Sequence, residues 1–246
     1  MSDFSKRKLL RVSGKHRAEF LQGLVTNDVK KLKDGLVYAA LLTPQGKYLA
    51  DFLLVPHSDA ILIDVAEPQA AGLLQRLTMY KLRADVAIEA TDLIVSRGVS
   101  QMPDGAFADP RADGLGWRAY GNDDVSEQVD WLALYVSLGI PQAGQELGPD
   151  SFILEMDFER LNGVDFKKGC YVGQEVTARM KHKTELRKGL ATVMVDGNSQ
   201  VGAEITADGK PAGTLHTIAG NQALAYLRFD RAKGQMQAGD AKITRI

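Results

Sequence analysis

The stretch Lys168–Glu175 has the sequence KGCYVGQE and contains the only cysteine of this 246-residue chain. Cys170 stands between two glycines, and a helix is predicted to follow it over residues 173–182. Glycine allows a tight turn and lets backbone amides approach a ligand or another chain closely. Three basic residues and the amino-terminal end of that helix would stabilise a thiolate, the residues being Lys167, Lys168 and Arg179. The stretch therefore predicts a site built around a reactive thiol.

Other interpretations of this cysteine stay open. A lone cysteine is often a small buried hydrophobic residue, in which case the stretch is structural. A cysteine hydrolase would need a histidine brought to Cys170 by folding, and the four histidines, at positions 16, 57, 182 and 216, are scattered. With one cysteine there is also no zinc-like spacing, so no metal site is predicted.

Lys168–Glu175 resembles the K-G-C-[YF]-x-G-Q-E signature of the YgfZ-type folate-binding proteins. That family is a branch of the superfamily containing the T-protein (aminomethyltransferase) of the glycine cleavage system. Further stretches are similar to the same family in the same order, namely Phe20–Asp28, Thr43–Lys47 with Asp51-Phe52, Tyr80–Arg83, Asp109–Arg111 and Gly116–Arg118. The resemblance covers about residues 6 to 230, and its octapeptide is specific enough to be improbable by chance.

The resemblance implies an α+β fold like that of the T-protein, in which several small parts frame a folate channel and a small all-β barrel module lies at the C-terminus. It predicts a folate-binding α+β region of two intertwined subdomains over residues 1–185 and a β-barrel-like domain over residues 186–246. Short strand-like segments after Lys188, separated by the Asp196-Gly197 and Asp208-Gly209 turns, also indicate a small all-β module.

The cofactor that the resemblance implies is tetrahydrofolate or another reduced folate. A pterin ring needs an apolar or aromatic slot and a carboxylate or amide acceptor, and the glutamate tail needs a basic residue. With Cys170 as the reactive, catalytic group, the residues expected at the cofactor are Lys168, Gly169, Tyr171, Gly173, Gln174, Glu175, Arg179, Trp117, Arg118, Asn27 and Asp28. Aromatic residues also fill cores, arginines also solvate surfaces, and Asn27 and Asp28 also suit a turn or a helix boundary.

One departure from the T-protein bears on the reaction. The T-protein carries a catalytic aspartate shortly after the strand that aligns with residues 61–65, whereas this chain continues through residues 66–71 with alanines where that acid is expected. The resemblance therefore implies a related scaffold without aminomethyltransferase activity. The resemblance further implies that such a folate-binding scaffold assists the assembly or repair of iron-sulfur enzymes, including those that thiolate tRNA. A tetrahydrofolate-dependent aminomethyl or one-carbon transferase is the alternative, and a scaffold with a structural motif is the third interpretation.

Composition sets further bounds on partners and compartment. One cysteine excludes an internal disulfide and suits a reducing compartment, and a net charge of -1 does not favour stable direct binding of nucleic acid. The residues after Lys6 give no signal-peptide core, and no apolar run approaches the roughly 18 residues of a spanning helix. We expect a cytoplasmic protein with no membrane partner. Its expected partners are a reduced folate and iron-sulfur assembly proteins or client enzymes.

The periodicity of apolar residues predicts the local structure coarsely. A hairpin is expected from residues 36–43 and 48–55, followed by a strand over 60–65 and a helix from Pro68 to Tyr80. Residues 101–116 are expected to form a loop, and a helix is expected over 124–138.

Overall fold

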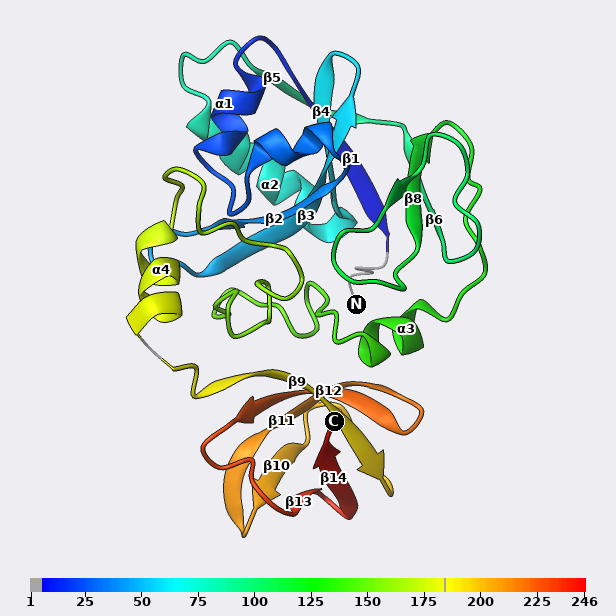
Figure 1. The fold of residues 1–246 in the computed structure, drawn as a ribbon, viewed down its shortest axis with the longest axis vertical. Coiled ribbons are helices and arrows are strands. Elements are labelled where there is room, and N and C mark those ends of the chain that lie inside the picture. The colour runs from blue at the N-terminus through cyan, green and yellow to red at the C-terminus, as the bar shows by residue number, and fades with distance from the viewer. Residues whose placement is uncertain (1–5, 184) are drawn as a thin grey trace. The chain divides into compact units, whose positions relative to one another are not determined.

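The computed structural model describes residues 6–183 and 185–246, which form two compact units (Figure 1). The first unit contains the described residues up to Val129 together with Glu159–Val176, and the second contains Asp130–Phe158 and Thr177–Ile246. The first unit is therefore discontinuous in sequence. The expected division into a folate-binding region over residues 1–185 and a barrel domain over residues 186–246 stays a prediction.

A five-stranded antiparallel sheet is the centre of the first unit. Its strands follow in the order β2 (Val37–Leu42), β3 (Tyr48–His57), β4 (Ala60–Ala66), β1 (Arg7–Ser13) and β5 (Ala87–Thr91). The expected hairpin and third strand are confirmed by β2, β3 and β4. Every residue of β2 and β4 is buried, as is typical of strands that are covered on both faces.

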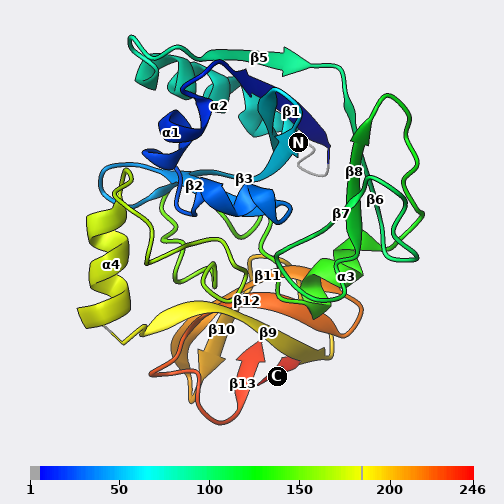
Figure 2. The same ribbon diagram turned by 45° about the horizontal axis from the view of Figure 1, so that its top comes forward.

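Helices cover one face of this sheet (Figure 2). They are α1 (Arg17–Gln22), the 3-10 helix η1 (Val29–Lys33) and α2 (Glu67–Tyr80). Ile63 and Val65 of β4 share a core with Leu73 and Leu77 of α2. Because successive side chains of a strand point to opposite faces, Asp64 must face away from that core. The same alternation places Tyr38 and Asp51 on the face away from the helices.

A smaller sheet in the first unit has the order β6-β8-β7, with β6 (Ile94–Gly98), β8 (Trp117–Gly121) and β7 (Phe107–Ala108). The helix expected over residues 124–138 is wrong for its first half, since α3 spans only Trp131–Ser137. Side-chain oxygens hold the preceding segment extended beside β6. Glu127 accepts from the amides of Val99 (2.8 Å) and Ser100 (3.1 Å), and Ser96 accepts from the amide of Val125 (2.9 Å).

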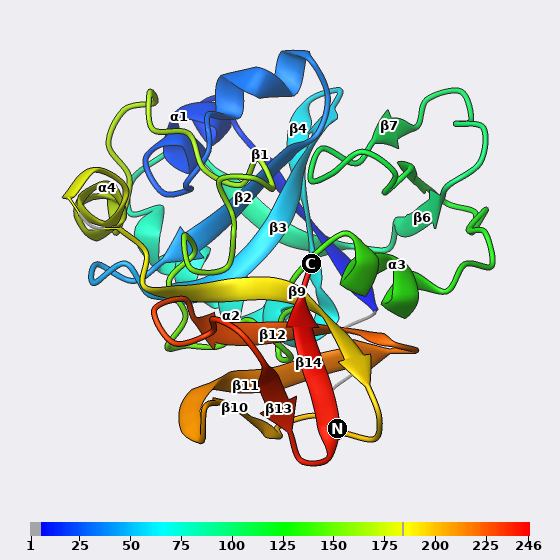
Figure 3. The same ribbon diagram turned by 60° about the horizontal axis from the view of Figure 1, so that its bottom comes forward.

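The second unit is built on a closed six-stranded barrel (Figure 3), which confirms the expected all-β module. Its order is β10 (Glu204–Ala207), β11 (Lys210–Ala219), β12 (Gln222–Arg228), β9 (Lys188–Asp196), β14 (Ala241–Arg245) and β13 (Met236–Ala238). Two glutamates join the segment before Glu159 to this barrel. Glu146 accepts from the Thr217 hydroxyl (2.5 Å), and Glu155 accepts from the Tyr226 hydroxyl (2.7 Å).

Candidate functional site

The octapeptide leads into helix α4 (Gln174–Lys183), close to the expected 173–182. Within it Lys168, Tyr171 and Gly173 are buried, whereas Gly169, Cys170 and Glu175 are exposed. Cys170 is a free, exposed thiol. The loop thus keeps two anchors inside the protein and presents the sulfur to solvent.

Lys168 is the first anchor. Its ammonium donates to the carbonyl oxygens of Gln22 (2.7 Å) and Val25 (2.5 Å), at and just after the end of α1, where helix carbonyls lack intrahelical partners. The ammonium also lies 5.0 Å from the centre of the Tyr171 ring. Burial lowers the pKa of Lys168 to about 8, against the opposing charges of nearby carboxylates, so the group stays protonated at neutral pH. Lys168 thus joins the octapeptide to Phe20–Asp28, another stretch in which the sequence resembles the YgfZ-type family.

Gly173 is the second anchor, and here the backbone conformation requires glycine. Its φ is +84°, and a β-carbon would lie 2.6 Å from the carbonyl oxygen of Thr43. Gly46, in the hairpin turn, is also constrained to be glycine. Its φ is +75°, and a β-carbon there would lie 2.8 Å from the β-carbon of Val176. The hairpin turn and the start of α4 therefore touch backbone to backbone. At Gly169 a β-carbon would meet no atom within 4 Å, so close packing does not require glycine there.

Asn27 is buried beside the octapeptide, and its carboxamide is fully hydrogen-bonded. Its Nδ2 donates to the carbonyl oxygens of Tyr38 (2.8 Å) and Asn162 (2.7 Å). Its Oδ1 accepts from the backbone amide of Asp28 (2.8 Å) and the ammonium of Lys31 (3.1 Å). Asn27 therefore ties strand β2 to the segment that leads into the octapeptide.

Asp28 caps the helix η1. Its carboxylate accepts from the backbone amide of Lys30 (3.0 Å) and from the side-chain amide of Gln22 (3.1 Å). These contacts agree with the other interpretation of Asn27 and Asp28 given by the sequence, that they form a turn or a helix boundary. Their assignment to a cofactor stays a prediction.

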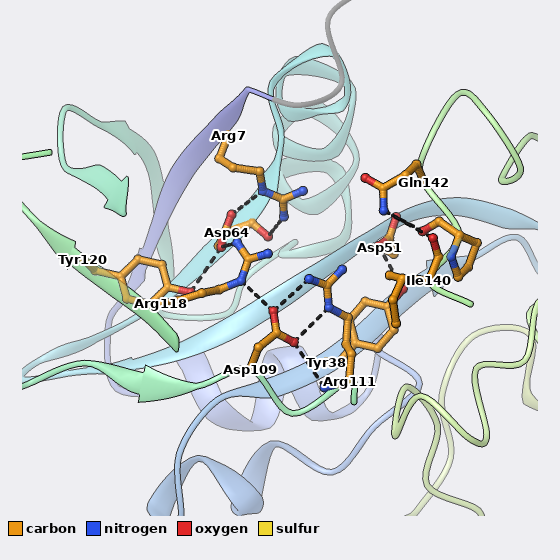
Figure 4. A network of polar contacts seen from close by, with 11 residues as sticks. Arg7, Tyr38, Asp51, Asp64, Asp109, Arg111, Arg118, Tyr120, Ile140 and Gln142 are labelled. Carbon is orange, nitrogen blue, oxygen red and sulfur yellow. Dashed lines mark hydrogen bonds and ion pairs between the residues drawn. The ribbon is translucent and has the colours of Figure 1, made fainter. Parts of the chain in front are cut away.

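Figure 4 shows Arg118 within a network of charged side chains. Arg118 is buried, with 3% of its surface exposed. It donates to Asp64 (2.9 Å) and to Asp109 (2.8 Å). Asp64 also accepts from Arg7 (2.6 Å), and Asp109 accepts two bonds from Arg111 (2.9 and 2.8 Å). Each of these two aspartates thus meets two guanidinium groups, joining β1, β4 and β8 to the loop after β7.

The network shifts the protonation of its members. Burial would raise the pKa of Asp64, but the charges of Arg7 and Arg118 outweigh burial and hold it below its usual value. The pKa of Asp109 is lowered in the same way, because Arg111 and Arg118 outweigh its burial. Burial and the charge of Asp64 raise the pKa of Tyr120, whose hydroxyl donates to Asp64 (3.1 Å). Both carboxylates are therefore ionised near neutral pH.

A third buried carboxylate, Asp51, has different neighbours. It accepts from the hydroxyls of Tyr38 (2.9 Å) and Tyr48 (2.6 Å), and Tyr48 in turn accepts from Gln69 (3.0 Å). Burial and the charge of Asp51 raise the pKa of both tyrosines, so both hydroxyls stay donors. Among the ion pairs of the described residues none involves Asp51. Two hydroxyls leave about two of the four lone-pair positions of this carboxylate unused.

Sequence reasoning missed Asp51 and Asp64 as polar centres. A detectable signal existed, because each is the single acid within an otherwise apolar strand, LADFLLV or AILIDVA. A carboxylate in such a strand requires a buried partner.

The other residues expected at the cofactor lie in different places. Trp117 is 3% exposed, and its indole packs against Gly98 of the neighbouring strand in the smaller sheet. Gln174 and Glu175 open α4, and the exposed Arg179 follows within the second unit.

The described residues lack two kinds of feature. Between residues 6 and 183 and from 185 onward, no group of three or more His, Cys, Asp or Glu side chains could hold a metal ion. In the same ranges no helix is both long and apolar enough to cross a bilayer.

Known proteins are similar to this chain over most of its length. The family described as "CAF17, C-terminal beta-barrel domain" matches residues 187–246. The mitochondrial iron-sulfur cluster assembly factor IBA57 of Mus musculus is 30% identical, covering 94% of this chain and 78% of the relative. The Homo sapiens protein of that name is 29% identical with the same coverage.

A solved structure shows the same fold. The glycine cleavage system aminomethyltransferase T from Bartonella henselae superposes with a TM-score of 0.79 over 99% of this chain and 83% of that chain, at 14% sequence identity. The expected T-protein-like fold is therefore confirmed, together with its C-terminal barrel.

The expected cytoplasmic location is contradicted by these relatives, which are named as mitochondrial proteins. That expectation depended on one free cysteine and on the lack of a signal-peptide core. Neither property separates one reducing compartment from another.

Proposed function

The chain belongs to the family of the iron-sulfur cluster assembly factor IBA57, and on that premise we propose that it acts in iron-sulfur cluster assembly, with Cys170 as the group that contacts the cluster or its sulfur. The exposure of this single thiol carries the proposal. A thiolate is the ligand that iron-sulfur clusters use. A fixed, solvent-facing thiol can therefore meet a cluster that another protein holds.

The loop geometry supports presentation of Cys170 to a partner. Lys168, two residues before it, and Gly173, three residues after it, are fixed by contacts inside the first unit. The intervening backbone has little freedom to withdraw the sulfur. Since a cluster takes four protein ligands, the others come from an assembly protein or a client enzyme in this proposal.

The experiment replaces the thiol in cells that lack the endogenous protein. Cells complemented with Cys170→Ser should lose the activity of dependent iron-sulfur enzymes, while Val201→Ser, at an exposed position of the barrel unit, should restore it. The enzymes assayed should include one that thiolates tRNA, the client class that the octapeptide resemblance implies. Full restoration by Cys170→Ser, at equal protein level, would reject the role of the thiol.

Reduced folate is the proposed cofactor. The residues expected to contact it fit poorly in part, because the polar groups of Asn27 and Arg118 are bonded inside the protein and Trp117 is buried. Asp51 fits better, since a pterin presents adjacent N–H donors and this carboxylate has unused acceptor positions beside two tyrosine donors. We therefore propose Asp51 as the acceptor for the pterin. When bound, a reduced folate would carry a one-carbon group or supply a ring that can be oxidised and reduced.

A calorimetric titration with tetrahydrofolate tests this assignment. The wild-type protein should bind saturably, and Asp51→Asn should bind roughly tenfold or more weakly, because a hydrogen bond to a charged acceptor contributes about 1.5–3 kcal/mol. Equal binding by wild type and Asp51→Asn would show that Asp51 does not contact the folate. If the wild type does not bind tetrahydrofolate, the proposal of a folate cofactor is rejected. Formation of methylenetetrahydrofolate from an aminomethyl donor would instead establish the transferase alternative.

A further inference from the structure

Figure 2 shows where α2 ends and a turn leads into β5. The end of α2 and this turn expose three apolar side chains of the first unit. Leu82 is 86% exposed, Met79 is 69% exposed and Tyr80 is 38% exposed. Among the large apolar residues of the described part of the chain, Leu82 has the highest exposed fraction. We call Arg76–Arg83 the α2–β5 tip.

The conformation of Leu82 is unfavourable for leucine. Its φ is +45°, in the left-handed region that follows many helices and that glycine or asparagine usually occupies. A leucine can offset this strain by burying its side chain, but Leu82 buries almost nothing within its own chain. A contact outside the chain would give this residue the burial that the fold does not.

Hydrogen bonds tie the tip to the rest of the first unit. The Lys81 amide donates to Leu77 (3.1 Å), and the Lys81 ammonium donates to the carbonyl oxygen of Val86 (3.1 Å). The amide of Asp85 donates to Nδ1 of His16 (3.1 Å). These bonds fix both ends of the turn, and the apolar side chains cannot fold back without breaking them.

Positive charge surrounds these apolar side chains. The eight residues of the tip contain Arg76, Lys81 and Arg83 and no acidic residue, in a chain whose net charge is -1. The next acid in sequence, Asp85, lies 4.0 Å from the ammonium of Lys15. Apolar and aromatic side chains flanked by basic ones match the boundary of an anionic bilayer, where each basic residue near the surface adds to the attraction.

We propose that the α2–β5 tip docks the protein onto a lipid surface with anionic headgroups. Met79, Tyr80 and Leu82 enter the interfacial layer, and the exposed Arg76 and Arg83 meet the phosphates, while the ammonium of Lys81 stays bonded to Val86. Three side chains on a turn offer far less than the roughly 800 Å² per partner of a standard protein interface, and like charges oppose contact between two copies of the tip. A peripheral contact of this kind needs no spanning helix, and the proposal departs from the expectation, drawn from the sequence, that the protein has no membrane partner.

Vesicle flotation of the full chain tests the proposal. The protein should float with phosphatidylcholine vesicles that contain about a third phosphatidylglycerol, and not with phosphatidylcholine alone, and high salt should weaken the binding. Leu82→Asp should reduce the bound fraction at least severalfold. Val201→Asp is the matched control, because Val201 is also exposed (61%) but lies in the barrel unit outside the tip.

Leu82→Gly separates lipid binding from folding. Glycine tolerates the positive φ, so this variant should be at least as stable to heat as the wild type and should still lose most vesicle binding. The proposal is overturned if the wild type ignores anionic vesicles at low salt, or if Leu82→Gly floats as well as the wild type. Binding through the tip to an acidic protein or to nucleic acid, with none to vesicles, would also overturn it.

Discussion

The charge network around Arg118 and the loop that carries Cys170 belong to the same compact unit, but they direct their polar groups differently. In the network the carboxylates of Asp64 and Asp109 form ion pairs with the guanidinium groups of three arginines, namely Arg7, Arg111 and Arg118. In the loop the ammonium of Lys168 is bonded inside, and the thiol two residues later is exposed. One region uses its chemistry to hold strands together, and the other uses it to present a single atom.

This difference shows which residues of the family motifs have a structural role. Asn27, Arg118 and Lys168 have the residue types that bind anionic or polar ligands, yet their polar atoms bond to backbone or to buried side chains. Residue type alone cannot separate a ligand contact from an internal partner. The partner of each side chain depends on contacts far apart in sequence.

The largest expected effect would break the network. Asp64→Ala leaves the guanidinium groups of Arg7 and Arg118 without this carboxylate and should lower the free energy of unfolding by about 3–5 kcal/mol. Urea denaturation, followed by circular dichroism, measures the loss. Asp92→Ala is the control, because Asp92 is fully exposed and its nearest contact with Lys8 is 3.9 Å, so no measurable loss is expected. A small effect of Asp64→Ala would show that the network contributes little to stability.

Acid should weaken the network. Because the folded protein lowers the pKa of Asp64 and Asp109, their contribution to stability is complete above the ordinary value of about 4 and is lost as the pH falls below it. We expect a loss on the order of 2 kcal/mol or more between pH 5 and acid conditions. Denaturation at a series of pH values measures it. Asp109→Asn should flatten this dependence, and an unchanged slope would contradict the assignment.

The smallest expected effect compares two glycines of the loop. Gly173→Ala forces a β-carbon against the carbonyl oxygen of Thr43 at a positive φ and should cost about 1–3 kcal/mol. Gly169→Ala meets open space and should change stability by less than about 0.5 kcal/mol. Thermal unfolding of the two variants gives the comparison. Similar losses for both would mean that the loop is held by something other than its Gly173 contact.

Strong local patterns made part of the fold predictable. The hairpin of β2 and β3, strand β4, helix α2 and the barrel strands follow apolar periodicity and turn residues, and α4 begins within one residue of its expected start. The extended segment before α3 was not predictable, because Glu127 is fixed by amides of Val99 and Ser100, nearly thirty residues earlier. The octapeptide located the exposed thiol, whereas the Tyr38–Asp51 contact depends on strand register.

The discontinuity of the first unit has a consequence for synthesis of the chain. Asn27 and Lys31 are made early, but Asn162 and Asp165, which they bind, leave the ribosome more than 130 residues later. Until then the carbonyl oxygens of Gln22 and Val25 lack the ammonium of Lys168, and the first unit lacks its last segment, Glu159–Val176. The nascent chain must therefore hold an incomplete unit while residues 130–158 are added, at roughly 5–20 residues per second. The same contacts that fix the loop of Cys170 make it among the last parts of this unit to close.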